Sequence, residues 1–225
     1  MPRHDLLVQP LTAAAFLPFG QVIEAAPGTA HHAINDGHAQ RYDDLAEIDT
    51  ATAGGRPRLA IFRALPRSVP LHLTLVERHR LGSQLFMPLA PQRFLVVVAE
   101  AGPAPAARAL RAFLAGPGQG INMRPGTWHH PLLALDDGAD FLVIDRAAAD
   151  AADDCEVHRF AEAGVQMWIT ALPRTLPIAD RPAPVACVAL QDERAIRLGS
   201  GTLVDAPRFG HPTSGSISRS CKAGT

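Results

Sequence analysis

Polar side chains suited to acid–base or metal chemistry follow a run of alternating hydrophobic residues. Apolar residues occupy every second position over 69–75, and Glu77 and His79 continue this alternation. On an extended strand all of them share one face, which is expected to point inward. A turn at 81–83 then allows the return strand to bring Gln84 near them. Burying polar groups is costly unless they are paired or bind something, so this cluster is the first candidate site.

A second group of candidate residues follows the turn at Pro125-Gly126. Trp128, His129 and His130 are consecutive. Neighbouring residues on a strand face opposite sides, so only one of the two histidines can enter a given cavity. Trp128 is expected to pack in the core or at a subunit contact.

Other potential metal ligands have spacings that indicate no site. The histidines of the polar stretch 31–44 suit no periodic element, and we interpret them as solvated loop residues around the turn Asn35-Asp36-Gly37; they are His31, His32 and His38. The cysteines are odd in number and far apart, which argues against a disulfide framework and a thiolate zinc site; they are Cys155, Cys187 and Cys221.

The composition excludes several classes of partner. The 225 residues are 47% hydrophobic and carry a net charge of −1, with no basic stripe. Nucleic acid and anionic membranes are therefore not expected as partners. No apolar stretch reaches the roughly 18 residues of a spanning helix, and the N-terminus lacks the pattern of a signal peptide. We therefore expect a cytoplasmic protein.

Many short strands at even spacing predict an all-β barrel. Strands are expected over 58–64, 94–99 and 140–146, and the second of these is apolar on both faces, which is typical of a covered central strand. Helix is expected to be limited to short turns, one of them in T-A-A-A-F. The segment 108–114 is either a strand or a short helical turn, because its periodicity fits both.

The chain changes in composition near Ile169. Proline, glycine and serine are frequent from there to the C-terminus, which is typical of a linker or disordered segment. We therefore expect one domain over residues 1–169. Residues 170–225 are expected to form a poorly structured appendage with no assigned function.

The two polar groups have a spacing similar to that of the metal-binding cupins. Glu77-x-His79-x4-Gln84 resembles the first cupin motif, H-x-H-x3-4-E, with Glu in place of one His and Gln in place of Glu. Gly126-x2-His129 resembles the second, P-x-G-x2-H, although Pro125 directly precedes Gly126. This spacing selects His129 over His130.

A longer series of motifs narrows the resemblance to the ureidoglycolate lyase family, formerly called ureidoglycolate hydrolase. Over residues 5–168 these motifs occur in order: F-G-Q-V-I-E, I-F-R-A, E-R-H-R-L-G-S-Q-L-F-M-P-L, F-L-V-V-V-A, G-Q-G-I-N, G-T-W-H-H-P-L-L-A-L and D-F-L-V-I-D-R. The resemblance implies a cupin-like β-barrel (double-stranded β-helix), a homodimer, and nickel or another divalent metal. The implied reaction converts (S)-ureidoglycolate to glyoxylate and urea in allantoin (purine) degradation.

The candidate residues suit this chemistry. Eliminating urea needs a base for the hydroxyl proton, an acid for the leaving nitrogen and positive charge for the carboxylate. The hypothesis assigns both catalysis and metal ligation to one set, with its metal acting as a Lewis acid: Glu77, His79, Gln84 and His129. Alternatively, Glu77 is a general base or pairs with an arginine such as Arg63, and Gln84 hydrogen-bonds the urea group.

Further residues are candidates for substrate binding. Arg63 and Arg124 suit a carboxylate, because guanidinium binds it bidentately; Arg124 suits a surface position equally. Ser83, which lacks an evident His-Asp relay, and Asn122 complete this set as binding residues.

Two other functions remain open from the residues alone. One is a cupin hydrolase or isomerase that acts on another small hydroxy acid. The other is a cupin-like binding module without turnover, which the inward pair Glu77 and His79 disfavours.

Overall fold

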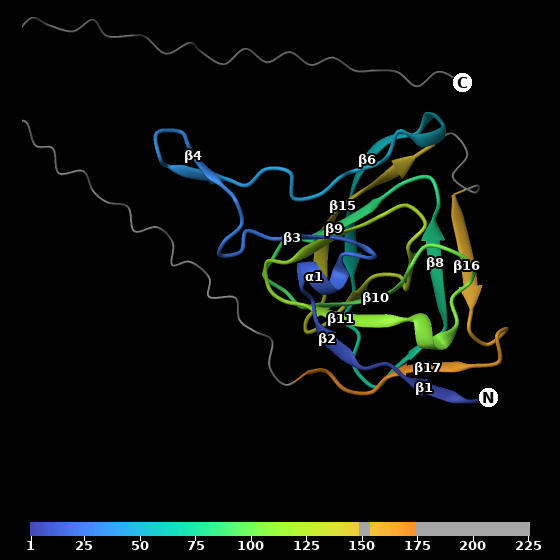
Figure 1. Cartoon of the computed structure of the whole chain (residues 1–225). Helices are drawn as coiled ribbons and strands as arrows, with labels where there is room; N and C mark the ends of the chain where they lie inside the picture. The colour runs from blue at the N-terminus through green and yellow to red at the C-terminus, as the bar shows by residue number, and fades with distance from the viewer. Residues whose placement is uncertain (149–153, 174–225) are drawn as a thin grey trace, which may run out of the picture. The chain divides into compact units, whose positions relative to one another are not determined.

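The computed structural model of the chain describes residues 1–148 and 154–173, and its regular elements are mostly β-strands (Figure 1). The strands are β1 (Arg3–Asp5), β2 (Val8–Pro10), β3 (Gly20–Ile23), β4 (His32–Ile34), β5 (Ala39–Arg41), β6 (Arg56–Ala64), β7 (Leu71–Leu73), β8 (Leu75–His79), β9 (Gln84–Pro88), β10 (Phe94–Ala99), β11 (Arg111–Ala115), β12 (Gly120–Met123), β13 (Trp128–His129), β14 (Leu133–Ala134), β15 (Ala139–Ala147), β16 (Cys155–Arg159) and β17 (Gln166–Ile169). The helices are the short α1 (Ala13–Phe16) and two 3-10 turns, η1 (Thr52–Gly54) and η2 (Ala107–Ala109). Within these residues, no helix has the length and apolar character needed to cross a membrane.

Two main sheets form the body of the described chain. One has the strand order β16-β8-β13-β10-β11-β2, with β14 also paired to β10, and the other has the order β3-β12-β9-β15-β6. They face each other like the walls of a barrel, but in the part described hydrogen bonds do not close them into one cylinder. The all-β, cupin-like fold class expected from the sequence is confirmed.

A buried apolar cluster fills the space between the two main sheets. Phe94 and Val98 of β10 meet Phe86, Phe141 and Val143 from the facing sheet. The alternate residues of β10, Leu95 and Val97, join a second cluster on the outer side of the seven-stranded sheet, where β1, β17 and β7 form a covering three-stranded sheet. Strand β10 is therefore covered on both faces, as its sequence predicts.

One expectation about the alternating run is wrong. Residues 69–79 do not form one strand: β7 pairs with β17, whereas β8 pairs with β16 and β13. The chain passes from one sheet to the other at Thr74, and the alternation changes phase there. Leu71, Leu73 and Val76 all reach the outer cluster. Glu77 and His79 thus point to the inside of the barrel on the face opposite to Val76.

Several local predictions are confirmed. The short helix α1 begins after Thr12, whose Oγ1 accepts a hydrogen bond from the amide of Ala15 at 3.2 Å. The ambiguous segment 108–114 contains the end of η2 followed by β11. Trp128 is fully buried in the outer cluster.

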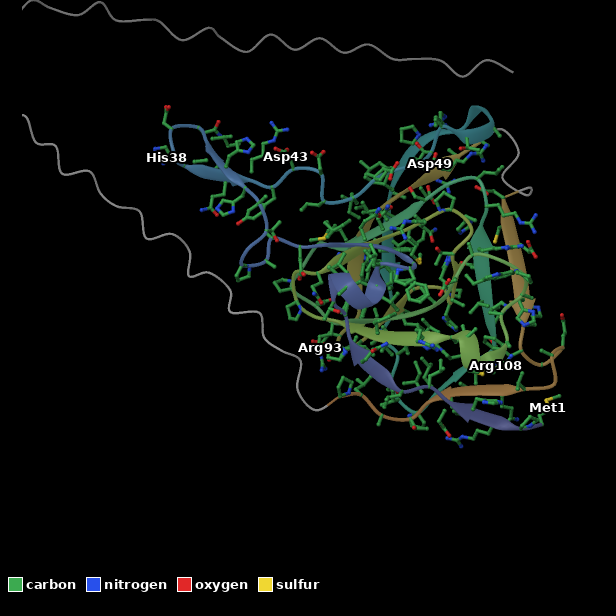
Figure 2. All side chains as sticks on the ribbon, in the orientation of Figure 1. Met1, His38, Asp43, Asp49, Arg93 and Arg108 are labelled. Carbon is green, nitrogen blue, oxygen red and sulfur yellow. The ribbon has the colours of Figure 1, made fainter. Side chains whose placement is uncertain are left out.

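Strands β4 and β5 form a separate two-stranded hairpin around the predicted turn. Asn35, Asp36 and Gly37 all have positive φ, between 54° and 87°. No residue from 21 to 49 is buried, and the hairpin stands off the barrel with His38 and Asp43 exposed (Figures 1 and 2). Of the appendage expected over 170–225, all but residues 170–173 lies outside the described residues.

Candidate functional site

Glu77, His79 and His129 form a compact cluster on the inner face of the seven-stranded sheet. His129 of β13 is the direct partner of Glu77 in antiparallel register with β8, so both side chains face the same way. Glu77 Oε1 lies 3.7 Å from His129 Nε2, and the His79 and His129 rings are 5.4 Å apart between centroids. Each residue offers a ligand atom within 4.8 Å of the other two.

The protonation state of His129 is set by its burial. The imidazole lies 3.0 Å from the carbonyl of Thr127 through Nδ1, which assigns the proton to that nitrogen. Nε2 is then the unprotonated atom, and it is buried without a hydrogen-bond partner among the described residues. Burial lowers the pKa of His129 from 6.5 to about 3. Its contact with Glu77 is therefore not an ion pair at neutral pH.

Gln84 approaches the cluster from the facing sheet. The turn after β8 carries the chain across to β9, where Gln84 and Phe86 share the inner face. The side chain of Gln84 is buried, and its Oε1 has no hydrogen-bond partner in the described chain. The alternation and the turn at 81–83 led us to expect Gln84 beside Glu77 and His79. The side chains do lie on the same side of the barrel interior, although β8 and β9 do not pair.

These side chains border a cavity of about 390 Å³, which we call the main cavity. Its polar wall is formed by Glu77, Gln84 and His129. The apolar part of the wall comes from both sheets and the segment after β13: Phe62, Phe86, Pro131 and Leu132. Glu77 is the single carboxylate in this wall. The cavity is large enough for a small acid, with its polar groups gathered on one side.

The cluster also fits a divalent metal ion. Two atoms that each lie about 2.1 Å from one ion are roughly 3–4 Å apart, and the 3.7 Å between Glu77 and His129 falls in this range. The free Nε2 of His129 and the free Oε1 of Gln84 are buried acceptors that lack a donor. One carboxylate and two imidazoles suit several first-row divalent ions.

The structure does not bring the two candidate arginines to the cluster. Arg63 adjoins the main cavity, but its guanidinium is bound to Asp140 at 2.8 and 2.9 Å, and its side chain is 81% exposed. It does not pair with Glu77. Arg124 is exposed and donates to the carbonyl of Leu17. Neither guanidinium forms a hydrogen bond or ion pair with Glu77, Gln84 or His129.

Ser83 and Asn122 are buried, but their side chains hold the backbone of the segment before η1. The hydroxyl of Ser83 accepts from the amide of Asp49 at 2.9 Å and donates to its carbonyl at 3.2 Å. Asn122 lies on the outer face of β12 and donates to Gln21 and to the carbonyl of Glu47. Both are therefore placed to support the fold around the site.

Three neighbours of the cluster were not identified from the sequence. The carbonyl of Thr127 fixes the tautomer of His129, and a backbone group leaves no sequence signal. Cys155 is a free, exposed thiol opposite His79, and its Sγ lies 3.9 Å from Glu77 Oε2. Arg58 borders a smaller second cavity together with His79. Arg58 shares a face of β6 with Phe62, which lies four residues later, but the sequence does not show that this is the inner face.

Two solved structures align weakly with the chain. A 3,4-ketoisomerase from Helicobacter canadensis aligns with a TM-score of 0.37 and 13% identity, over 60% of this chain and 88% of the other. The TDP-quinovose 3,4-ketoisomerase from Campylobacter jejuni aligns with a TM-score of 0.35 and 12% identity, over 59% and 88%.

Relatives of known name are much more similar in sequence. A ureidoglycolate lyase of Burkholderia cepacia is 53% identical over 142 residues, which are 63% of this chain and 79% of the relative. That of Burkholderia mallei (strain NCTC 10229) is 50% identical over 141 residues, with 63% and 82% covered. That of Pseudomonas syringae pv. syringae is 44% identical over 159 residues, with 71% and 92% covered. A family model described as ureidoglycolate lyase matches residues 3–167. The chain therefore belongs to the ureidoglycolate lyase family.

Proposed function

We propose that the protein is a ureidoglycolate lyase that eliminates urea from (S)-ureidoglycolate to give glyoxylate, in the degradation of allantoin. The observation that carries the proposal is the main cavity, in which one carboxylate, two free buried acceptors and an apolar wall meet. Family membership supports the reaction class, a carbon–nitrogen lyase.

Glu77 is the residue we assign to proton transfer. The hydroxyl and the ureido nitrogen of the substrate are attached to the same carbon. Glu77 takes the hydroxyl proton as the carbonyl of glyoxylate forms, the carbon–nitrogen bond breaks, and Glu77 returns a proton to the nitrogen of urea. One carboxylate can serve both steps, because its two oxygens reach neighbouring atoms. This matches its position as the single acid in the cavity wall.

Gln84 is the residue we assign to the ureido group. Its buried Oε1 has no partner among the described residues, and a ureido N–H is the donor it lacks. Amide oxygen is a weak metal ligand compared with imidazole and carboxylate. Phe62, Phe86 and Leu132 give the rest of the cavity an apolar wall, which lowers the local dielectric and strengthens the polar contacts beside it.

Glu77, His79 and His129 would hold a divalent metal, and nickel is our first choice. When bound, such an ion supplies Lewis acidity that lowers the pKa of the substrate hydroxyl and offsets the carboxylate charge. The Thr127 carbonyl keeps Nε2 of His129 free for this role.

The reaction is tested with racemic ureidoglycolate and the full-length protein. We expect stereoselective release of glyoxylate, so that turnover stops after half of the racemate is consumed. Other small hydroxy acids serve as competing candidates. Turnover of one of them without glyoxylate release would support a different hydrolase or isomerase, and binding without turnover of any candidate would support a binding module.

We also propose that the protein is a cytoplasmic homodimer. The exposed free thiol of Cys155 suits a reducing compartment. Leu59 and Ile61 on the outer face of the edge strand β6 are 69% and 54% exposed, and Leu65 and Leu89 nearby are also exposed. A second copy would cover this apolar surface.

Light scattering tests the homodimer. The wild-type protein should have twice the mass of one chain, and the double variant Leu59→Glu, Ile61→Glu should have the mass of one chain. A wild-type protein with the mass of one chain would refute the dimer.

A further inference from the structure

The cluster of Glu77, His79 and His129 separates two cavities of different character. The main cavity is largely apolar, as described above. The second, which we call the small cavity, has a volume of about 70 Å³ and is bordered by His79 and by charged residues. This volume is about that of two water molecules, and so of a group the size of a carboxylate. Glu77 lines the main cavity and His79 lines the small one, and the two side chains lie two residues apart on the same face of β8. A short molecule bound at the cluster is therefore next to both cavities.

Arg58 presents its guanidinium on the inner face of β6. It is the partner of Asp145 in the ladder between β6 and β15, and Ala60 and Phe62 continue the same face toward the main cavity. Nε and Nη2 of Arg58 donate to the two carboxylate oxygens of Asp145 at 2.8 and 2.7 Å. Asp145 is buried, whereas the Arg58 side chain is half-exposed. The guanidinium is therefore held in a fixed orientation while part of it remains accessible.

The third nitrogen of Arg58, Nη1, donates no hydrogen bond within the described chain. The other arginine at the small cavity, Arg146, is more fully engaged. Its Nε and Nη2 donate to the carbonyls of Thr52 and Ala53, and its Nη1 lies 3.6 Å from Asp154. Of the described cations at this cavity, Arg58 is the one with donors to spare.

We infer that Arg58 binds the substrate carboxylate in the small cavity and thereby directs the ureido group to Gln84 in the main cavity. The inference rests on the proposed function for the identity of the substrate. It gives the substrate a direction across the cluster: carboxylate beside His79 and Arg58, hydroxyl at Glu77, and ureido group toward the apolar wall. Arg58 thus takes the carboxylate-binding role that the sequence suggested for Arg63. The guanidinium of Arg63 lies on the outer face of the same strand with Leu59 and Ile61.

Arg63 provides a matched control. Both arginines are on β6, and both donate bidentately to an aspartate directly across on β15. Arg58→Gln and Arg63→Gln thus each remove one ion pair between the same two strands. We expect Arg58→Gln to raise KM for ureidoglycolate about 10- to 100-fold with a smaller effect on kcat. Arg63→Gln should keep KM within about twofold, and Arg58→Lys should fall between Arg58→Gln and wild type.

A binding measurement tests the inference without turnover. Glycolate and its uncharged amide, glycolamide, differ only in the carboxylate, and calorimetric titration of the full-length protein compares them. Wild type and Arg63→Gln should bind glycolate at least about tenfold more tightly than glycolamide. Arg58→Gln should lose most of this preference while remaining folded at the assay temperature, as circular dichroism checks, although its melting temperature should fall further because Asp145 is buried. The inference is overturned if wild type shows no preference, if Arg58→Gln keeps it, or if Arg63→Gln loses it. Failure of the proposed function would show separately, as absent glyoxylate release by wild type.

Discussion

The protein has two histidine-containing regions, the cluster inside the barrel and the hairpin β4–β5, and they differ in what surrounds the imidazoles. His129 is buried, its Nδ1 is oriented by a carbonyl, and its Nε2 has no partner among the described residues. At the hairpin and its flanks, His31 packs on the half-buried Tyr42 and His32 lies 3.7 Å from Asp43, and both imidazoles are exposed. Residue type is therefore a weak guide to function. A buried acceptor that lacks a donor and also lines a cavity is the informative feature, because such a group is costly unless something binds it.

Substitution inside the cluster should have the largest effect. Glu77→Ala and His79→Ala should each lower kcat/KM at least about 100-fold, because one removes the proton-transfer group and the other a metal ligand. Both variants should fold, since neither side chain anchors a strand. Steady-state kinetics and circular dichroism check this together. Unfolded variants would instead make these side chains structural.

Metal removal should have the next largest effect. Treatment with a chelator should abolish most turnover, and nickel should restore it. His129→Asn should weaken metal binding by more than about 100-fold, as measured by competition with a chromophoric chelator. If the chelated protein contains no metal and keeps full activity, the cluster acts through its own acid and imidazoles alone.

Acidification should destabilise the metal-free protein through His129. Because the pKa of His129 is about 3 in the fold and 6.5 is its ordinary value, only the unfolded state takes up this proton between these pH values. The part of the unfolding free energy that depends on neutral His129 is fully present above pH 6.5 and is lost as the pH falls toward 3. The unfolding free energy should therefore change with pH by at most about 1.4 kcal/mol per pH unit through this residue. Urea unfolding at several pH values measures this pH dependence, which should be smaller in His129→Asn.

Burial also lowers the pKa of His130, so part of the pH dependence should remain in that variant. Equal slopes in wild type and variant would contradict the assignment.

Substitution on the hairpin should have the smallest effect. His31→Ala and His38→Ala should leave kcat/KM within about twofold and the unfolding free energy within about 0.5 kcal/mol, because both imidazoles are exposed. The same assays as for the cluster apply. A loss comparable to that of His79→Ala would remove the distinction between the two regions.

The sequence predicted the cluster because local alternation determines its geometry. Glu77 and His79 share a face of one short strand, and the turn before Trp128 delivers His129 to the same side. Which of these side chains share a face is decided by residues close to them in the sequence, so it can be predicted without knowing the whole fold. The covered strand β10 was predictable for a similar reason, since its hydrophobic residues are continuous.

The substrate-binding set could not be predicted, because the inner face of a strand depends on what it pairs with. In β6 both faces carry apolar residues: Phe62 lines the cavity while Ile61 is exposed. The pattern alone does not say which arginine of this strand points inward, and Arg63 was the wrong choice under our inference. The change of phase at Thr74 has the same origin, since the chain changes sheets there.

The most direct measurement counts urea and glyoxylate in one reaction, with wild type and with Glu77→Gln at equal metal content. We predict one urea per glyoxylate and no ammonia from wild type, and neither product at a significant rate from a folded Glu77→Gln protein. Ammonia in place of urea, or a variant as fast as wild type, would contradict elimination by this cluster.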